Sequence, residues 1–199
     1  MSEWFAELLE RELRPWVRLS GDQVTRLRDH YELLLRWNRK INLTSVEPGV
    51  EMVLRHYCES LFFGAHLTGE SASLVDIGSG AGFPGIPIAV LKPEWKITLI
   101  ESNQRKAVFL REATRGWSNI SILSKRAEDV SERFDWLVSR AVDPKELLGL
   151  VPRLASRIGL MLGEDDFFSV QKASGIAWSE PIRLPWGDRR LCVFGDCST

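Results

Sequence analysis

Four glycines follow a short apolar run in the stretch LVDIGSGAGFPGIPIAV, residues 74–90, and they are the residues best placed for chemistry. Gly78, Gly80, Gly82 and Gly85 come directly after the run LVDI. In an open α/β sheet, the loop after the first strand lies at the carboxyl edge, where ligands bind. Glycines let the backbone of such a loop approach a ligand closely. Three of the four satisfy G-x-G-x-x-G, which is by itself a weak sign of a dinucleotide site.

The residues around these glycines indicate which cofactor the loop would hold. A pyrophosphate needs free backbone N–H groups at the helix start, and Pro84 and Pro87 remove two of them. Asp76, just before the glycines, would repel a phosphate. S-adenosylmethionine carries a sulfonium and an ammonium group and no phosphate, so Asp76 would favour it. We therefore predict this cofactor, and an NAD(P)-dependent oxidoreductase is the alternative.

Three further positions fit an adenosine. Glu101 ends the second apolar run, at about the 20-residue distance beyond the loop where an acid meets the ribose hydroxyls. Both adenosine cofactors share that ribose, so Glu101 does not discriminate between them. Ala127 and Glu128 follow the next apolar run and could border the adenine, although Glu128 could equally cap a helix.

The elements that must position these residues fall into two regions. Residues 1–70 show only helical periodicity; Ser20 and Gln23 form a capping-box pattern, and Pro48 suits the first turn of a third helix. From Ser73 onward, short apolar runs alternate with amphipathic stretches. The apolar runs predict strands at 73–77, 96–101, 120–123, 134–139 and 157–162. The amphipathic stretches predict helices that begin near Phe83, Asn103, Ala127, Pro144 and Asp165.

This alternation predicts the fold class. Strands that alternate with helices indicate right-handed crossovers and a mainly parallel, doubly wound α/β sheet. Two short extended runs within residues 180–195 predict an antiparallel hairpin at one sheet edge. We therefore predict a helical extension over residues 1–70 packed on an α/β core over residues 71–199, as one compact domain overall.

The composition is that of an ordinary globular chain, with 44% hydrophobic residues, 27% charged residues and a net charge of −1. No apolar run reaches the roughly 18 residues of a membrane span, and the acidic, amphipathic start is unlike a signal peptide. The three cysteines are widely spaced, which argues against a disulfide or zinc framework. We expect a cytoplasmic protein without a metal site. The basic segment 105–126 could bind a polyanion, although a solvated helix face is the commoner explanation for such a segment.

Several motifs together resemble one family, the bacterial 16S ribosomal RNA guanine-N7 methyltransferases, also called glucose-inhibited division protein B. The resemblance covers about residues 37–142, with a weaker similarity in GDRRLCVF near the end. The motifs occur in the family's order: NLTS (42–45), RHYCESL (55–61), DIGSGAGFPGIPIA (76–89), LIES (99–102), KAVFL (106–110), RAE (126–128) and SRAV (139–142).

The resemblance implies a class I S-adenosylmethionine-dependent methyltransferase, Rossmann-like with an antiparallel sheet edge and an N-terminal helical extension. Such an enzyme would methylate N7 of one guanine in small-subunit (16S) ribosomal RNA, and its partner would be that RNA or the assembling 30S subunit. Asn42, Arg55 and His56 lie in motifs that would face the cleft of the cofactor, and they are the candidates for substrate binding. With the positions derived above, the predicted cofactor site consists of Asp76, Gly78, Ser79, Gly80, Gly82, Phe83, Glu101, Ser102, Ala127, Glu128 and Arg140.

Methyl transfer to guanine N7 requires few catalytic side chains. Guanine N7 carries a lone pair and no proton, so methyl transfer needs no general base and depends mostly on positioning. Arg140 is the candidate catalytic residue, because a guanidinium can donate to guanine O6 or to a phosphate. A structural ion pair with an acid such as Asp76 is the alternative. His30 and His66 are expected to be structural.

The chain departs from the family pattern near the end of the fifth strand. A lysine usually precedes the glycine there, whereas this chain has Leu162. The C-terminal segment also reads Asp-Arg-Arg where relatives often have Arg-His. If the lysine helps to hold RNA, its loss would weaken turnover, so a non-catalytic RNA-binding relative is a further alternative.

Overall fold

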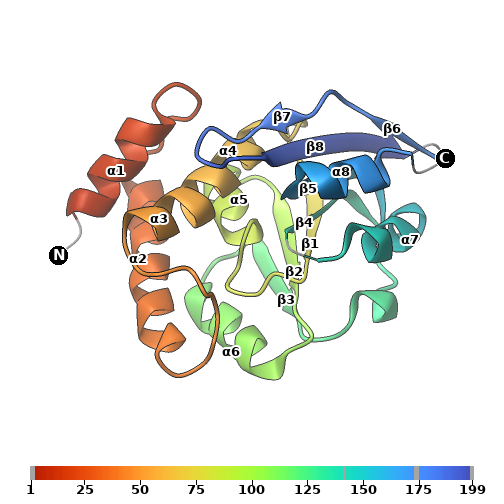
Figure 1. Ribbon diagram of the computed structural model, residues 1–199. Helices are drawn as coiled ribbons and strands as arrows, with labels where there is room; N and C mark the ends of the chain where they lie inside the picture. Colours follow the sequence, from red (N-terminus) through yellow and green to blue (C-terminus); the bar gives the residue numbers. More distant parts are fainter. Residues whose placement is uncertain (1–2, 141, 173–174, 198–199) are drawn as a thin grey trace.

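The computed structural model describes residues 3–140, 142–172 and 175–197 and has a central sheet with helices packed on both of its faces (Figure 1). The strands are β1 (Ser73–Ile77), β2 (Lys96–Ile100), β3 (Ile120–Leu123), β4 (Phe134–Arg140), β5 (Ala155–Gly163), β6 (Ile176–Trp178), β7 (Ile182–Arg183) and β8 (Arg190–Cys197). Within these described ranges they form one eight-stranded sheet in the order β3-β2-β1-β4-β5-β8-β6, and β7 also pairs with β8.

The sheet is parallel from β3 to β5 and antiparallel at one edge. β1 pairs with β2 and β4 in parallel, and β3 and β5 extend the parallel part on either side. β8 runs antiparallel to β5, and β6 and β7 pair antiparallel with β8. This arrangement confirms the predicted doubly wound sheet and its antiparallel edge. The chain order changes direction between β1 and β4, so the loops after these two strands border the crevice where such folds bind ligands.

Helices α5 (Gly85–Leu91), α6 (Gln104–Ala113), α7 (Pro144–Leu154) and α8 (Glu164–Val170) cover the sheet. The helices predicted near Asn103, Pro144 and Asp165 begin within one residue of those positions. The α-helix predicted to begin near Ala127 does not form, and this prediction is wrong: the chain makes only the 3-10 turn η2 (Ala127–Asp129) there. Val130 is completely buried directly after this turn and β4 follows shortly, which leaves too little chain for a helix.

The N-terminal extension contains α1 (Glu3–Leu13), α2 (Gly21–Asn38) and one continuous helix made of α3 (Val50–Met52), the π-helical η1 (Val53–Cys58) and α4 (Glu59–Ala65). The third helix begins after Pro48 rather than with Pro48 in its first turn, because Gly49, with φ +128°, is the residue at its start.

One hydrophobic cluster joins the extension to the sheet. It combines Leu9, Leu27 and Tyr57 from the extension with Leu74 and Ile97 from β1 and β2. A second cluster packs α7 and α8 on the opposite face. The extension thus completes the core of one sheet face, and its boundary at residue 70 stays a prediction.

The predicted capping box at the start of α2 is confirmed. The Gln23 backbone N–H donates to Ser20 Oγ at 3.3 Å, and the Ser20 N–H donates to Gln23 Oε1 at 2.8 Å. The Gln23 amide also donates from Nε2 to the Val90 carbonyl at 2.8 Å, which ties α2 to α5. The cap therefore fixes both the start of α2 and its position on the core.

Substitution of the cap tests this role. Ser20→Ala removes the acceptor for the Gln23 N–H, so we expect the free energy of unfolding to fall by about 1 kcal/mol. Thr25→Ala, which removes an exposed hydroxyl within the same helix, is the control and should not destabilise the chain. Urea unfolding followed by circular dichroism measures both. Equal midpoints for Ser20→Ala and the wild type would show that the cap contributes nothing.

Candidate functional site

The glycine loop, residues 78–85, leaves the carboxyl end of β1 and leads into α5. Gly78, Gly80 and Gly82 have φ values of +72°, +57° and +92°, a region in which glycine avoids the strain that a side chain would cause. The Gly80 N–H donates to Glu101 Oε2 at 2.9 Å, and Glu101 Oε1 accepts from the Asn103 N–H at 2.8 Å. Glu101 therefore joins the loop to the start of α6.

Asp76 holds the other end of the loop. Its Oδ2 accepts from the Gly85 N–H at 3.0 Å, and a carboxylate is favoured at this first residue of α5. Oδ1 is buried and has no hydrogen-bond partner among the described residues. Burial raises the pKa of Asp76 to about 7, although the Gly85 hydrogen bond lowers it. The carboxylate is completely buried, so Oδ1 is the atom left for any further contact.

A cavity of about 160 Å³ lies beside the loop, and we call it the loop cavity. Ile77, Ile100 and Leu147 give it apolar walls. It brings together four of the predicted cofactor residues, which are Gly78, Ser102, Ala127 and Glu128, and Lys125 and Arg126 also border it. Its mixed apolar and polar lining suits a partly polar ring.

A second cavity of about 240 Å³, which we call the arginine cavity, lies next to it at the ends of β4 and β5. Arg55, Arg140 and Arg190 line it together with Glu59. Met161, Leu162 and Leu184 supply apolar walls. The two cavities thus differ in character, because only the second is lined by a buried acid and three guanidinium groups.

Val142 separates the two cavities, since it lines both. Gly78 packs directly against it: a Cβ atom at Gly78 would lie 2.5 Å from Val142 Cγ2, closer than real Cβ contacts. The first glycine of the loop is therefore required by packing as well as by its positive φ. The neighbouring residue 141 of the SRAV motif lies outside the described residues.

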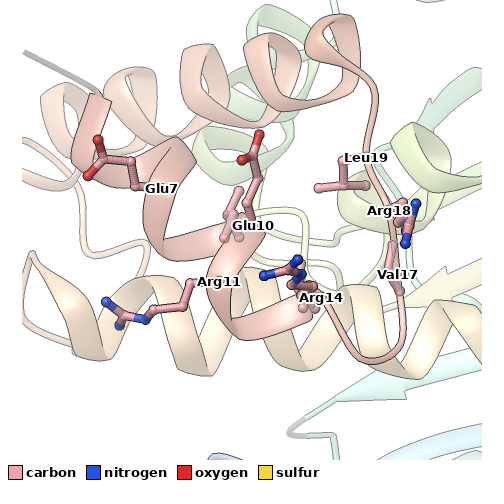
Figure 2. Close-up of a pocket in the computed structure, with 9 residues that line it drawn as sticks. Glu7, Glu10, Arg11, Arg14, Val17, Arg18 and Leu19 are labelled. Carbon is pink, nitrogen blue, oxygen red and sulfur yellow. The ribbon is translucent and has the colours of Figure 1, made fainter.

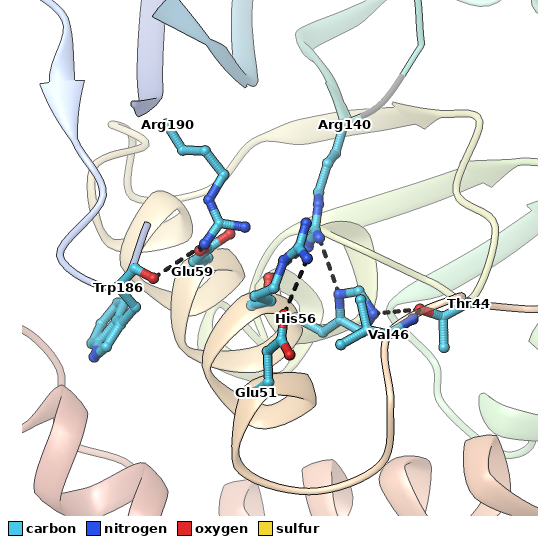
Figure 3. A network of polar contacts seen from close by, with 9 residues as sticks. Thr44, Val46, Glu51, His56, Glu59, Arg140, Trp186 and Arg190 are labelled. Atoms are coloured by element: carbon cyan, nitrogen blue, oxygen red, sulfur yellow. Dashed lines mark hydrogen bonds and ion pairs between the residues drawn. The ribbon is translucent and has the colours of Figure 1, made fainter. Parts of the chain in front are cut away.

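Arg140 is held in the arginine cavity by neutral groups rather than by an acid. Figure 3 shows its guanidinium beside His56. Arg140 Nη1 donates to the Arg55 carbonyl at 2.7 Å, and Nη2 lies 3.0 Å from His56 Nδ1. Burial lowers the pKa of Arg140 to about 10, so it stays charged at neutral pH. The predicted alternative, a direct ion pair with Asp76, is not formed among the described residues.

His56 acts as a neutral acceptor in this network. A guanidinium only donates, so His56 Nδ1 must accept and Nε2 carries the proton, which it can donate to Thr44 Oγ1 at 2.7 Å. Burial, and then the charge of Arg140, lower the pKa of His56 to about 3. Its ring also stacks on Phe83 with centroids 4.6 Å apart. His56 therefore connects the glycine loop to Arg140.

The π-helical turn η1 carries Arg55 and His56, and Glu59 follows it directly. Turns of this kind widen a helix by one residue and occur often at functional sites. Arg55 makes an exposed ion pair with Glu51 at 3.2 Å, yet its Nε is buried and has no hydrogen-bond partner in the described part of the chain.

His30 fixes the glycine loop from the opposite side. His30 Nε2 lies 3.0 Å from the Ala81 carbonyl and Nδ1 lies 2.7 Å from the Tyr57 hydroxyl. Burial lowers the pKa of His30 to about 4. This contact explains why a helix of the extension carries a buried histidine, and it agrees with the structural role that the sequence predicts.

Some predicted residues lie away from both cavities. Asn42 is exposed, and in its motif it is Thr44 that reaches the site, through His56. The Phe83 ring packs among His30, His56 and Tyr57. Ser79, Gly80 and Gly82 shape the loop without lining either cavity, and the same holds for Asp76 and Glu101, which hold the loop.

Three residues of the site were not predicted from the sequence. Glu59 lies within the motif RHYCESL and Arg190 within GDRRLCVF, and Val142 ends SRAV. Each of these residues therefore lies in a motif that can be recognised in the sequence. Only the fold brings the first two side chains together, with Arg190 Nη2 2.6 Å from Glu59 Oε1.

Another cavity of about 580 Å³ lies in the extension, along α1 and the segment after it (Figure 2). Glu7, Glu10, Arg11 and Arg14 line it, and it shares no residue with the loop cavity or the arginine cavity. No group of three or more metal-ligating residues occurs among the residues that the structure describes. No described helix is long and apolar enough to cross a membrane.

The fold is that of class I methyltransferases. A solved SAM-dependent methyltransferase from Aquifex aeolicus superposes with a TM-score of 0.58 at 14% identity, over 75% of this chain and 93% of that one. Residues 23–162 match the family GidB, rRNA small subunit methyltransferase G. The chain belongs to this family, as its motifs predict.

Relatives agree with this assignment. Ribosomal RNA small subunit methyltransferase G of Nitrosomonas europaea is 44% identical over 131 residues, which are 64% of this chain and 60% of that protein. The Lactococcus lactis subsp. cremoris protein of the same name is 32% identical over 197 residues, covering 87% of this chain and 82% of its own. The chain spans about three fifths of the length of the relatives that it matches above 40% identity.

The contact between Gly78 and Val142 predicts a selective loss of cofactor binding. In Gly78→Ala the new methyl group collides with Val142 at the border of the loop cavity, so we expect the dissociation constant for S-adenosylmethionine to rise at least about tenfold. Gly116→Ala is the control, because Gly116 also has a positive φ, +81°, but has open space around its Cβ position. Calorimetry measures both. Equal affinities in the two variants would contradict the role of Gly78.

The buried imidazole of His30 predicts a pH-dependent stability difference. The folded-state pKa of about 4 lies below the value of about 6.5 expected for the unfolded chain, so protons favour unfolding between these values. The stability that neutral His30 provides is present above pH 6.5 and is lost as the pH falls toward 4. The wild type should therefore lose its advantage over His30→Gln by about 1 kcal/mol per pH unit below pH 6. Urea unfolding at several pH values tests this, and a pH-independent difference would contradict it.

Proposed function

We propose that this protein transfers a methyl group from S-adenosylmethionine to N7 of a specific guanine in 16S ribosomal RNA. The observation that carries the proposal is the pair of adjoining cavities at the carboxyl edge of β1 and β4. Val142 separates the loop cavity from the arginine cavity. Membership of the family favours methyl transfer over the NAD(P)-dependent oxidoreductase alternative.

The residues present fit this cofactor. The apolar walls of the loop cavity suit the adenine ring, and Ser102 and Glu128 offer polar atoms beside it. The buried Asp76 Oδ1 has no partner in the described chain, and a nearby cationic group would complete its contacts. S-adenosylmethionine, when bound, supplies a methyl group on a positively charged sulfur. The contacts of the predicted cofactor residues with it are part of this proposal.

The arginine cavity would receive the base. Guanine inside a folded RNA must leave its stack to reach such a pocket. Arg140 is pre-oriented by His56 and the Arg55 carbonyl, so its remaining donors can bind guanine O6 or a neighbouring phosphate. Positioning of N7 is then the main catalytic task, and no general base is required.

Ribosomal RNA or the assembling 30S subunit is the proposed partner, and the cytoplasm is the proposed place of action. The basic segment 105–126 lies on the loop-cavity side through Lys125 and Arg126. Basic side chains that neutralise phosphates make binding fall with salt concentration. Leu162, where the family pattern has lysine, lines the arginine cavity, so it replaces a charge there with an apolar wall.

The proposal is tested with small ribosomal subunits that lack the modification and with radiolabelled S-adenosylmethionine. Borohydride and aniline treatment, which cleaves RNA at N7-methylguanine, would locate the product. Incorporation at one guanine is expected. Binding of S-adenosylmethionine without any incorporation would favour the non-catalytic relative instead.

Arg140→Ala tests the arginine cavity within the same assay. We expect the methylation rate to fall at least about 100-fold, with a loss of only about 1–3 kcal/mol in unfolding free energy. Arg157→Ala is the matched control, because Arg157 lies on β5 toward the opposite end of the sheet and packs over Trp136. Full turnover in Arg140→Ala would exclude the role assigned to this guanidinium.

A further inference from the structure

The arginine cavity contains a buried acid that the proposed mechanism does not use. The Glu59 side chain is 1% exposed, at the start of α4, and lines the cavity. Its Oε1 lies 2.6 Å from Arg190 Nη2, but no group in the described part of the chain gives it a hydrogen bond of good geometry. Figure 3 shows Glu59 facing Arg190.

The pair is poorly explained by stability alone. The attraction between two buried charges can be smaller than the free-energy cost of removing both charges from water. Arg190 Nη2 also donates to the Trp186 carbonyl at 3.1 Å, so its guanidinium has a second contact besides Glu59. The cavity therefore contains a buried carboxylate whose contact in the described part of the chain is the ion pair with Arg190.

An unsatisfied donor accompanies this acceptor. Arg55 Nε is buried without a hydrogen-bond partner among the described residues, and Arg55 lines the same cavity. Buried polar atoms without partners cost free energy, so a ligand that pairs with both would be favoured. The site calls for a ligand that presents donors beside an acceptor.

The Watson–Crick edge of guanine has this pattern, because O6 accepts while N1–H and the N2 amino group donate side by side. Adenine presents an acceptor at N1, which a carboxylate would repel. We propose that Glu59 reads the N1–H and N2 amino group of the target guanine, an inference that rests on the proposed function. Arg55 or Arg140 would then donate to O6, and Met161 and Leu162 would pack on the ring.

The same carboxylate would assist the reaction itself. The N7 lone pair forms the new bond to the methyl carbon while the carbon–sulfur bond breaks toward sulfur, so the positive charge passes to the purine ring. A carboxylate at the N1 and N2 edge stabilises that charge as it develops. Burial raises the pKa of Glu59 to about 6, against the effect of Arg190, Arg140 and Arg55, so Glu59 is mostly ionised at pH 7.

The size of the cavity agrees with a single base. Its volume of about 240 Å³ is below the range of roughly 300–1,000 Å³ that encloses drug-sized ligands. Enzymes that act on extruded bases read them by hydrogen bonds to this edge and by packing on their faces.

The first test uses the wild-type protein, so it does not depend on the folding of a variant. The affinities for guanosine and for inosine, which keeps N1–H but lacks the N2 amino group, are measured by NMR titration at pH 7. We expect guanosine to bind at least about tenfold more tightly, the loss expected for one hydrogen bond to a charged group. Equal affinities, or binding of neither nucleoside, would overturn the proposal.

The second test uses Glu59→Gln, whose amide places a donor against a guanine donor. The single-turnover methylation rate on unmodified small subunits should fall at least about 100-fold, while the affinity for S-adenosylmethionine changes less than about twofold. Glu94→Gln, an exposed glutamate remote from the cavity, is the control and should match the wild type. Wild-type turnover in Glu59→Gln would overturn the role of Glu59 and leave the proposed function intact. Selective binding of guanosine by a wild type that methylates no ribosomal RNA would support Glu59 and contradict the proposed function.

Discussion

The backbone hydrogen bonds of two buried carboxylates organise this protein. Glu101 accepts from Gly80 and Asn103, and Asp76 accepts from Gly85, so both ends of the glycine loop are held at the carboxyl edge of the sheet. Between these contacts the loop takes positive φ angles at Gly78, Gly80 and Gly82. Both cavities depend on that conformation, since Gly78 borders the loop cavity and packs on Val142, which borders the arginine cavity.

The N-terminal extension takes part in this arrangement and also covers one face of the sheet. His30 contacts the loop at Ala81, and His56 stacks on Phe83 while it accepts from Arg140. Both histidines have pKa values lowered mainly by burial, which keeps them neutral hydrogen-bonding groups. The extension therefore contacts the loop through packed, uncharged groups.

Periodicity and turn chemistry were sufficient to predict the parallel strands, the antiparallel edge and the cap at Ser20, because each depends on neighbouring residues. The prediction at Ala127 failed because burial of Val130 and the start of β4 override a helical pattern. The roles of Asp76 and Glu101 in holding the loop could not be derived from their types, which suit a cofactor equally well. The pairing of Glu59 with Arg190 could not be predicted from the sequence, because α4 and β8 are far apart in the chain and only the fold brings them together.

We propose that the loop cavity holds a cationic adenosine cofactor without a phosphate. Titration calorimetry of the full chain with S-adenosylmethionine, and in parallel with NADH, tests this. We expect a dissociation constant in the micromolar range for S-adenosylmethionine and no detectable heat with NADH. Binding of NADH without binding of S-adenosylmethionine would contradict it.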